Sequence, residues 1–133
     1  MGVGQNRRDW RMTPREHPPY TRLEAWKACF HMATVVYRVT QSWPKSELYG
    51  LTSQARRAAY SAGANIAEGY AKRGSREFRR YLDISFGSLA ELGFALLLAR
   101  EVGLLSAEEW ISLDSAQQRA SQLVGGLMRS LRD

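Results

Sequence analysis

Residues 50–92, GLTSQARRAAYSAGANIAEGYAKRGSREFRRYLDISFGSLAEL, decide the fold of this chain. The first half is rich in alanine and glycine, which allow helix backbones to approach each other closely. The second half carries apolar residues at alternating four- and three-residue steps, beginning at Phe78 and continuing to Ala99. This spacing is typical of one face of a helix. The stretch therefore predicts two long helices that pack tightly against each other.

The ends of these two helices are marked by glycines and cations. The first is expected from about Gly50 to Ala71, and the sequence Lys72-Arg73-Gly74 ends it, with Gly74 in the left-handed cap. We expect Ser75 to cap the next helix and Gly103 to end it. Gly63, in mid-helix, costs about 1 kcal/mol relative to alanine, which predicts a close contact or a bend there.

One further helix is predicted on each side of this pair. Thr21 and Glu24 have the spacing of a capping box, and Pro44 ends the helix that follows. Ser106 and Glu109 form a second capping box before the last helix. The first of these helices is expected to bury a stripe of Leu23, Trp26, Phe30, Ala33, Tyr37 and Thr40, widened by Cys29, Met32, Val36 and Val39.

The helix after Ser75 has a second apolar stripe beside its heptad seam, which includes Ile84, Leu98 and Val102. Two apolar faces are typical of a central bundle helix or of a helix at a subunit interface. Strand-like alternation is absent from the sequence. We therefore predict an all-α fold, an antiparallel up-down-up-down four-helix bundle over residues 21–133. Residues 1–20 are interpreted as a flexible basic arm, either a disordered tail or a segment that contacts nucleic acid.

The composition of the 133 residues favours a single globular domain, with 44% hydrophobic and 24% charged residues. The net charge of +6 suggests an acidic partner such as nucleic acid, or serves solubility alone. The single cysteine excludes an internal disulfide and fits a reducing compartment. The longest strongly apolar run, Leu92 to Ala99, is shorter than the roughly 20 residues of a membrane span. With no signal-peptide pattern, we expect a cytoplasmic protein without membrane contact.

Side chains that usually carry catalysis are scarce. His17 lies in the arm, and His31 has no histidine one helical turn away, so a helical metal pair is absent from the sequence. Cys29 is better interpreted as a small buried hydrophobic residue than as a nucleophile. The Glu-x-x-His motif of carboxylate-bridged metal centres and the Gly-rich phosphate loop are both missing. We expect no enzymatic activity, no metal and no cofactor.

The most informative electrostatic feature is a basic cluster around the predicted turn between the two central helices. It favours contact with nucleic-acid phosphates without base readout, whereas the alternative is a solvated helix end. The candidate nucleic-acid-binding residues are Arg56, Arg57, Lys72, Arg73, Arg76, Arg79 and Arg80.

Three polar residues fall near the apolar helix faces. Glu68 and Glu91 are expected to form ion pairs with arginines of the basic cluster, within a subunit or across an interface, because an unpaired buried charge is costly. A direct functional role is the alternative for both carboxylates. Asn65 is expected to satisfy backbone or cross-helix hydrogen bonds.

Several motifs, in order, resemble the four-helix bundle proteins encoded in intervening sequences of bacterial 23S ribosomal RNA genes, also labelled S23 ribosomal protein. The resemblance covers about residues 22 to 125 and departs from the family at Gly63, where proline is common, and at Gly93, where an acidic or polar residue is common. The matching residues are Leu23-Glu24, Trp26-Lys27, Val36-Tyr37, Pro44, Gly50-Leu51-Thr52-Ser53-Gln54, Arg56-Arg57-Ala58-Ala59, Ala64-Asn65-Ile66-Ala67-Glu68-Gly69, Ser75, Glu77-Phe78 and Gly87-Ser88-Leu89-Ala90-Glu91-Leu92.

The resemblance implies a homopentameric barrel of four-helix protomers with no catalytic residue. It also implies relatedness to the accessory variability determinant of diversity-generating retroelements, which binds nucleic acid and a reverse transcriptase. We therefore expect a non-enzymatic, pentameric bundle with a basic surface that binds nucleic acid (structured RNA or RNA/DNA) or a nucleoprotein partner. The alternative is a scaffolding homo-oligomer that binds another protein, with its basic charge incidental.

Overall fold

The computed structural model describes residues 18–131 and has four long helices. No strand occurs in this part of the chain, which confirms the all-α prediction. Two short 3-10 helices, η2 (Pro19–Arg22) and η3 (Lys45–Glu47), precede α2 and α3 respectively. The four long helices are α2 (Glu24–Thr40), α3 (Leu51–Tyr70), α4 (Gly74–Glu101) and α5 (Ala107–Ser130).

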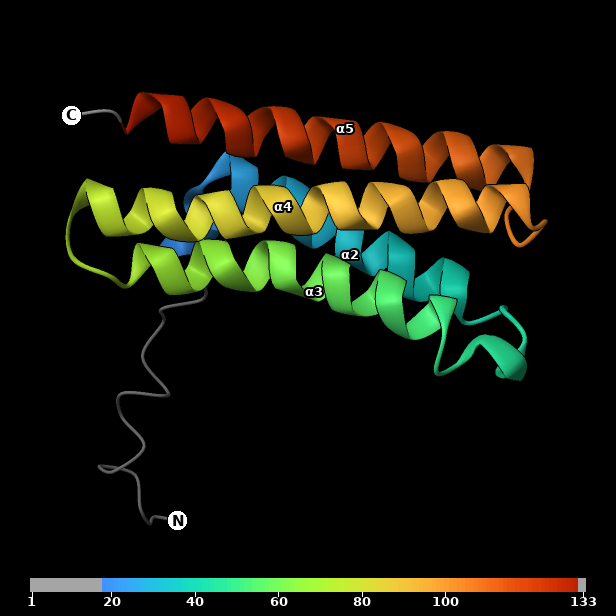
Figure 1. Cartoon of the computed structure of the whole chain (residues 1–133). Coiled ribbons are helices and arrows are strands. Elements are labelled where there is room, and N and C mark those ends of the chain that lie inside the picture. Colours follow the sequence, from blue (N-terminus) through green and yellow to red (C-terminus); the bar gives the residue numbers. More distant parts are fainter. Residues whose placement is uncertain (1–17, 132–133) are drawn as a thin grey trace, which may run out of the picture.

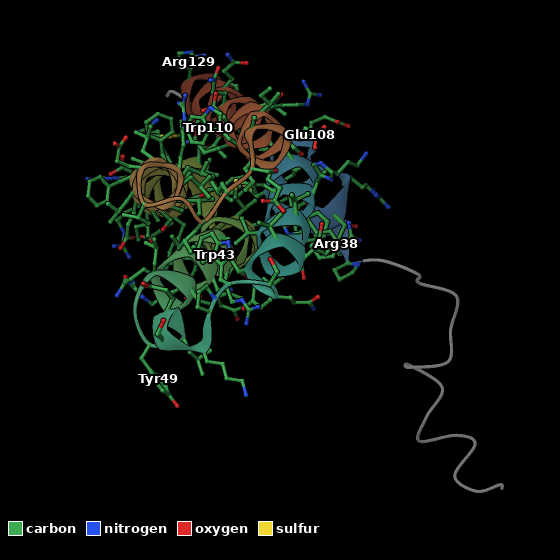
Figure 2. The ribbon with its side chains drawn as sticks, turned by 90° about the vertical axis from the view of Figure 1, so that its right-hand side faces the viewer. Arg38, Trp43, Tyr49, Glu108, Trp110 and Arg129 are labelled. Carbon is green, nitrogen blue, oxygen red and sulfur yellow. The ribbon has the colours of Figure 1, made fainter. Side chains whose placement is uncertain are left out.

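The helices form an antiparallel up-down-up-down bundle, as the sequence predicts (Figure 1). Each helix contacts two neighbours: α2 packs on α3 and α5, and α4 packs on the same two helices. The end-on view in Figure 2 shows the four helices arranged around a common core. The α3–α4 turn and the C-terminal end of α5 lie at one end of the bundle, and the α2–α3 and α4–α5 connections lie at the other (Figure 1).

The α3–α4 pair has the most extensive contact in the bundle. Small side chains on α3 allow it, because Ala55, Ala59 and Ala62 are completely buried. The Ser85 hydroxyl of α4 donates a hydrogen bond to the Ala62 carbonyl oxygen at 2.7 Å. So short a bridge between a side chain and the facing backbone requires closely spaced helices. The structure thus confirms the tight pairing predicted from residues 50–92.

The core is filled by large apolar side chains from all four helices. On α4 the buried positions follow the predicted heptad seam from Leu82 through Leu89 to Ala99. The largest completely or almost completely buried apolar side chains are Met32, Ile66, Leu82, Leu89, Leu92, Leu96 and Leu113.

The first helix buries a different stripe from the predicted one. Its buried residues are Ala25, Cys29, Met32, Val36 and Thr40, most of which were expected only to widen the stripe. The aromatic rings that were expected to be buried lie at the edge of the core or outside it. The prediction was wrong because a wide apolar surface on a helix does not reveal which part of it faces the neighbours.

Only one of the three predicted side-chain caps is present. At the start of α5, the Glu109 amide donates to the Ser106 hydroxyl and the Ser106 amide donates to the Glu109 carboxylate, both at 3.0 Å. At the first helix, α2 begins at Glu24, and the Thr21 hydroxyl instead donates to the Pro18 carbonyl oxygen. Ser75 lies inside α4, whose N-cap residue is Arg73. The predictions at Thr21 and Ser75 were therefore wrong.

The glycines separate into turn formers and packing positions. Gly74 and Gly103 have φ angles of +83° and +84°, a backbone conformation that disfavours side chains. Gly103 directly follows the C-cap of α4 and ends that helix as predicted. The predicted left-handed cap at Gly74 was wrong, because α3 already ends at Tyr70 with Ala71 as its C-cap, and Gly74 begins α4. The close approach on α3 lies at Gly69, where a Cβ atom would come within 2.6 Å of the Tyr81 Cβ. At Gly63 the nearest atom would be 3.8 Å away, so the predicted tight contact is at the wrong glycine. Helix α3 is continuous through Gly63.

Residues 1–17 of the predicted arm, including His17, lie outside the described residues. At the end of that arm, Pro19–Arg22 form a 3-10 helix. Helix α4 is long and apolar enough to cross a membrane by length and composition, with a mean hydropathy of 1.6 over 18 residues. Polar residues interrupt the apolar ones in α4, so the sequence contains no uninterrupted apolar run of this length. Of this 18-residue segment 44% is buried in the bundle, and the core helix of a soluble protein can have the same length and composition.

Candidate nucleic-acid interface

The α3–α4 turn presents three exposed cations. Helix α3 ends at Tyr70, and the left-handed Gly74 reverses the chain into α4. Lys72 and Arg73 lie in the turn, and Arg76 lies in the first turn of α4; all three are exposed. Within residues 18–131, no ion pair involves any of the three. Their charge is therefore available to an anionic ligand at this end of the bundle.

The next two arginines along α4 interact with other groups of the bundle. Arg79 donates from its guanidinium to the Leu131 carbonyl oxygen at 2.8 Å, so it joins α4 to the end of α5. Arg80 lies 3.6 Å from the Glu77 carboxylate in a solvent-exposed pair. Such pairs contribute little to stability. Lys72 and Arg80 also lie over the Tyr81 ring, at 5.4 and 5.2 Å from its centroid.

Arg56 and Arg57 lie away from the turn and bridge helices. The Arg56 side chain donates to the Thr40 hydroxyl at 2.8 Å and lies 4.6 Å from the centroid of the Tyr37 ring. Arg57 pairs with Glu91 of α4 at 3.2 Å and donates to Gln54. Arg57 precedes the end of α3 by 13 residues, or about 20 Å at 1.5 Å per residue.

The seven predicted cations therefore do not form one cluster. Five lie at the α3–α4 turn and the beginning of α4, and two lie toward the opposite end of α3. The separation follows from the antiparallel geometry, in which distance along the chain from a turn becomes distance along the bundle. We define the basic end as Lys72, Arg73 and Arg76, the exposed members without an ion pair in the described part of the chain.

The three predicted structural polar residues have different surroundings. Glu91 forms the ion pair with Arg57 described above, within one protomer. Asn65 donates to the Ser61 carbonyl oxygen at 2.9 Å and to its hydroxyl at 3.0 Å, and Ser61 in turn contacts Ser88 of α4 at 2.7 Å. Glu68 is exposed, and no ion pair involves it within residues 18–131.

Among residues 18–131, the side chains that could carry catalysis do not gather into a cluster. Burial raises the pKa of the Cys29 thiol to about 12, opposed by a weaker effect of its hydrogen bond with Ser85. This thiol therefore stays protonated at neutral pH. His31 is exposed on α2. Among the described residues, no group of three or more His, Cys, Asp or Glu side chains could hold a metal ion.

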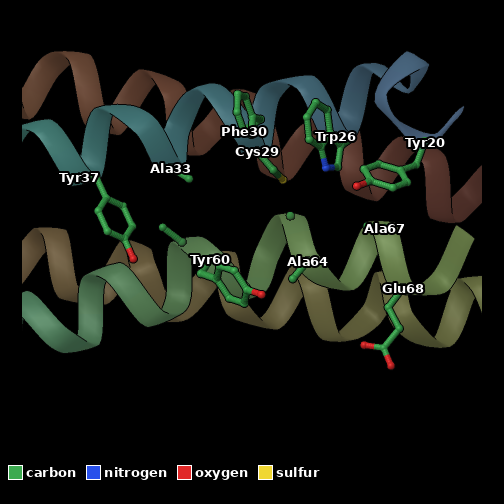
Figure 3. A pocket seen from close by; sticks show the side chains of 12 residues that line it. Tyr20, Trp26, Cys29, Phe30, Ala33, Tyr37, Tyr60, Ala64, Ala67 and Glu68 are labelled. Atoms are coloured by element: carbon green, nitrogen blue, oxygen red, sulfur yellow. The ribbon is translucent and has the colours of Figure 1, made fainter. Parts of the chain in front are cut away.

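Between α2 and α3 lies an aromatic groove that the sequence analysis did not predict (Figure 3). It has a volume of about 480 Å³ and is floored on α3 by small residues such as Gly63 and Ala64. Phe30 stacks on Trp26 with ring centroids 4.7 Å apart and remains 54% exposed. Glu68 lies at the edge of the groove and points away from α2 (Figure 3).

A second cavity of about 450 Å³ continues this groove toward the α2–α3 connection and shares Tyr37 and Tyr60 with it. Tyr49 lines this part and projects into solvent, with 92% of its surface exposed (Figure 2). We refer to both cavities together as the α2/α3 groove. The signal in the sequence was the excess of aromatic residues on the first helix, which exceeded what its core-facing stripe could bury.

A family model described as "23S rRNA-intervening sequence protein" matches residues 21–126 of the chain. Among solved structures, the chain resembles a protein of unknown function from the S23 ribosomal protein family of Bacteroides thetaiotaomicron VPI-5482. The TM-score is 0.71 at 18% sequence identity, over 78% of this chain and 97% of that chain. At this identity the likeness supports the fold alone. No curated protein matches the chain.

Proposed function

The chain belongs to the 23S rRNA-intervening sequence protein family, and on that premise we propose that it is a non-enzymatic, oligomeric bundle that binds nucleic acid at its basic end. Structured RNA is the ligand class we expect. The contacts would go to phosphates, because exposed Lys and Arg side chains at a helix turn neutralise the backbone without reading base edges.

The observation that carries this proposal is the exposure of Lys72, Arg73 and Arg76 and their lack of ion pairs within the described residues. All three are exposed, and no acidic side chain within residues 18–131 pairs with them. Cations placed only to complement a helix dipole belong at the C-terminal end of a helix. Lys72 and Arg73 fit that role after α3, but Arg76 lies in the first turn of α4, where the dipole disfavours a positive charge. A phosphate ligand explains all three positions.

The non-enzymatic part of the proposal is supported by the isolation of the reactive groups. The Cys29 thiol is buried and its pKa is raised, so the thiolate needed for nucleophilic attack is scarce. The acidic residues of the described bundle form no metal-binding group with His or Cys.

We further propose that the functional form is a homo-oligomer, specifically a pentamer, as the family resemblance implies. The support is the apolar surface that a single copy leaves exposed, because soluble monomers rarely expose large contiguous apolar patches. A protein partner such as a reverse transcriptase, and a cytoplasmic location, remain part of this proposal. The genes that flank the coding sequence would identify that partner class.

A salt titration tests nucleic-acid binding directly. A fluorescently labelled RNA hairpin is titrated with the protein at several salt concentrations between 50 and 200 mM, and anisotropy reports the affinity. We expect log K to fall linearly with log salt, with a slope near −0.9 for each phosphate neutralised on a duplex stem. No binding at 50 mM salt, or a slope near zero, would contradict the proposal.

A scaffolding oligomer that binds another protein is the second candidate, and its specific support is the exposed aromatic groove between α2 and α3. The two candidates differ in the same titration. A protein that forms its oligomer normally but fails to bind RNA at 50 mM salt would favour the scaffold.

A further inference from the structure

Helix α4 exposes a row of large apolar side chains on the side away from the core. Phe94 of α4 is 68% exposed, and Val102, the C-cap residue of this helix, is 58% exposed. We define the α4 ridge as Ile84, Phe94, Leu97, Leu98 and Val102, each at least 41% exposed.

The ridge lacks the electrostatic character of a nucleic-acid surface. No Lys or Arg occurs between Ile84 and Ala99, and the one acidic residue in this stretch, Glu91, is paired with Arg57. At the end of the ridge, Arg100 and Glu101 precede Val102 and have opposite charges, so they add no net positive charge. A phosphate-rich ligand would gain nothing here. Removing large apolar side chains from water is favourable, so the partner of this surface is expected to be apolar.

The α2/α3 groove has the shape and chemistry that the ridge needs. Small residues on α3, including Gly63 and Ala64, leave room along its floor, and exposed rings of Phe30 and Tyr60 form its sides. Helices α2 and α4 lie across the core from each other, where the Cys29 thiol meets Ser85, and the ridge residues are exposed outside that core. A ridge and a groove of the same copy therefore cannot meet.

We propose that the α4 ridge of one copy docks in the α2/α3 groove of the next copy. This inference rests on the proposed oligomer and adds its interface. Because the two surfaces differ, the contact is head-to-tail, and such contacts close into a ring when the rotation permits. A closed ring covers every ridge and every groove, whereas a two-fold dimer built from two ridges would leave both grooves exposed.

The ring has a consequence for the proposed nucleic-acid site. In a cyclic assembly, equivalent residues of all copies lie on one circle around the axis. The basic ends of all copies would therefore form a single ring of cations, which binds an extended polyanion at several points at once and raises its apparent affinity.

Two substitutions with matched exposure test the interface. Phe94→Asp places a charge on the ridge and Tyr60→Asp places one beside the groove, and both side chains are 68% exposed. Sedimentation velocity is expected to show that each variant alone is monomeric. When the two are mixed, the intact ridge of Tyr60→Asp fits the intact groove of Phe94→Asp, and we expect a one-to-one dimer that grows no further.

The control is Ile111→Asp on α5, a 65% exposed residue outside both surfaces, which should keep the wild-type oligomer. Circular dichroism verifies folding, and Leu97→Asp provides a second ridge variant if Phe94→Asp fails to fold. A mixture that stays monomeric, or a single variant that dimerises with itself, would overturn the interface.

An intact oligomer of Tyr60→Asp would also overturn it, and would assign the groove to another occupant such as residues 1–17 or a foreign protein. A wild-type protein that sediments as a monomer would instead contradict the proposal that the protein forms an oligomer.

Discussion

Two glycines of α3 illustrate how much a single residue depends on its neighbours. Gly63 and Gly69 are both helical. The side of α3 at Gly63 faces Cys29 across ordinary van der Waals distance, whereas Gly69 lies against Tyr81 and Phe78 of α4. The sequence predicted the close helix contact at Gly63, because a glycine in the middle of a helix lowers helix stability relative to alanine. It could not reveal the close contact at Gly69, which depends on the ring positions of a different helix.

Alanine substitutions at these two positions are expected to have opposite effects. In Gly69→Ala the new Cβ would approach Tyr81 Cβ to 2.6 Å and Phe78 Cδ1 to 3.0 Å, which predicts a loss of about 1–3 kcal/mol in unfolding free energy. Gly63→Ala, with its nearest contact at 3.8 Å, should gain up to about 1 kcal/mol. Urea denaturation measures both, and equal effects would contradict the packing described for α3.

The buried Cys29 predicts a pH dependence of stability. Its thiol has an ordinary pKa near 9.0 that burial raises to about 12. Above pH 9 the unfolded chain loses this proton while the folded protein keeps it, so stability falls as pH rises from 9 toward 12. Between pH 9 and 11 the unfolding free energy of the wild type should therefore decline more steeply than that of Cys29→Ala, by at most about 1.4 kcal/mol per pH unit. Parallel declines would show that the thiol is not protected.

At the scale of elements, the three-residue spacing of a capping box occurs before two helices but forms the cap at only one of them. Ser106 and Glu109 form the predicted capping box, whereas Thr21 and Glu24 do not, because η2 precedes α2 and the Thr21 hydroxyl bonds within that turn. The spacing alone does not reveal whether the preceding chain is extended or already turned. For the same reason, Gly74 in its left-handed conformation moved the start of α4 ahead of Ser75.

Removing the Ser106 cap that the structure contains should lower the unfolding free energy more than replacing Ser75, which was predicted to be a cap. Ser106→Ala deletes the acceptor of the Glu109 amide and is expected to lower the unfolding free energy by about 1 kcal/mol. Ser75→Ala replaces an exposed residue inside α4 that caps nothing and should change stability by less than about 0.5 kcal/mol. A larger loss for Ser75→Ala than for Ser106→Ala in urea denaturation would refute this assignment of the helix ends.

At the scale of the whole molecule, the four helices and their antiparallel order could be predicted because each apolar stripe is long and each connection is short. The arrangement of the charge could not be predicted as well. Arg56 and Arg57 lie on the helix that leads into the α3–α4 turn, but they precede its end by 13 or more residues and bridge α3 to α2 and α4 along the side of the bundle. The α2/α3 groove was missed because its aromatic rings have the helical spacing of a core.

The basic end accounts for nucleic-acid binding only if the position of its cations, and not just their total charge, determines the affinity. A triple variant Lys72→Gln, Arg73→Gln, Arg76→Gln removes the three exposed cations at the α3–α4 turn. The matched control Arg38→Gln, Lys45→Gln, Arg119→Gln removes three exposed cations from other parts of the bundle. Both variants lower the formal net charge from +6 by three, so a difference between them reports position alone.

The most direct measurement is the affinity of both variants and the wild type for one labelled RNA hairpin, by fluorescence anisotropy across a salt series. We expect the basic-end variant to lose at least tenfold in affinity at 50 mM salt. Its salt slope should also become shallower, by about 0.9 for each lost phosphate contact. The control should stay within about threefold of the wild type, since its cations would act only through screened long-range attraction. Equal losses in the two variants, or no loss in either, would contradict the assignment of nucleic-acid binding to Lys72, Arg73 and Arg76.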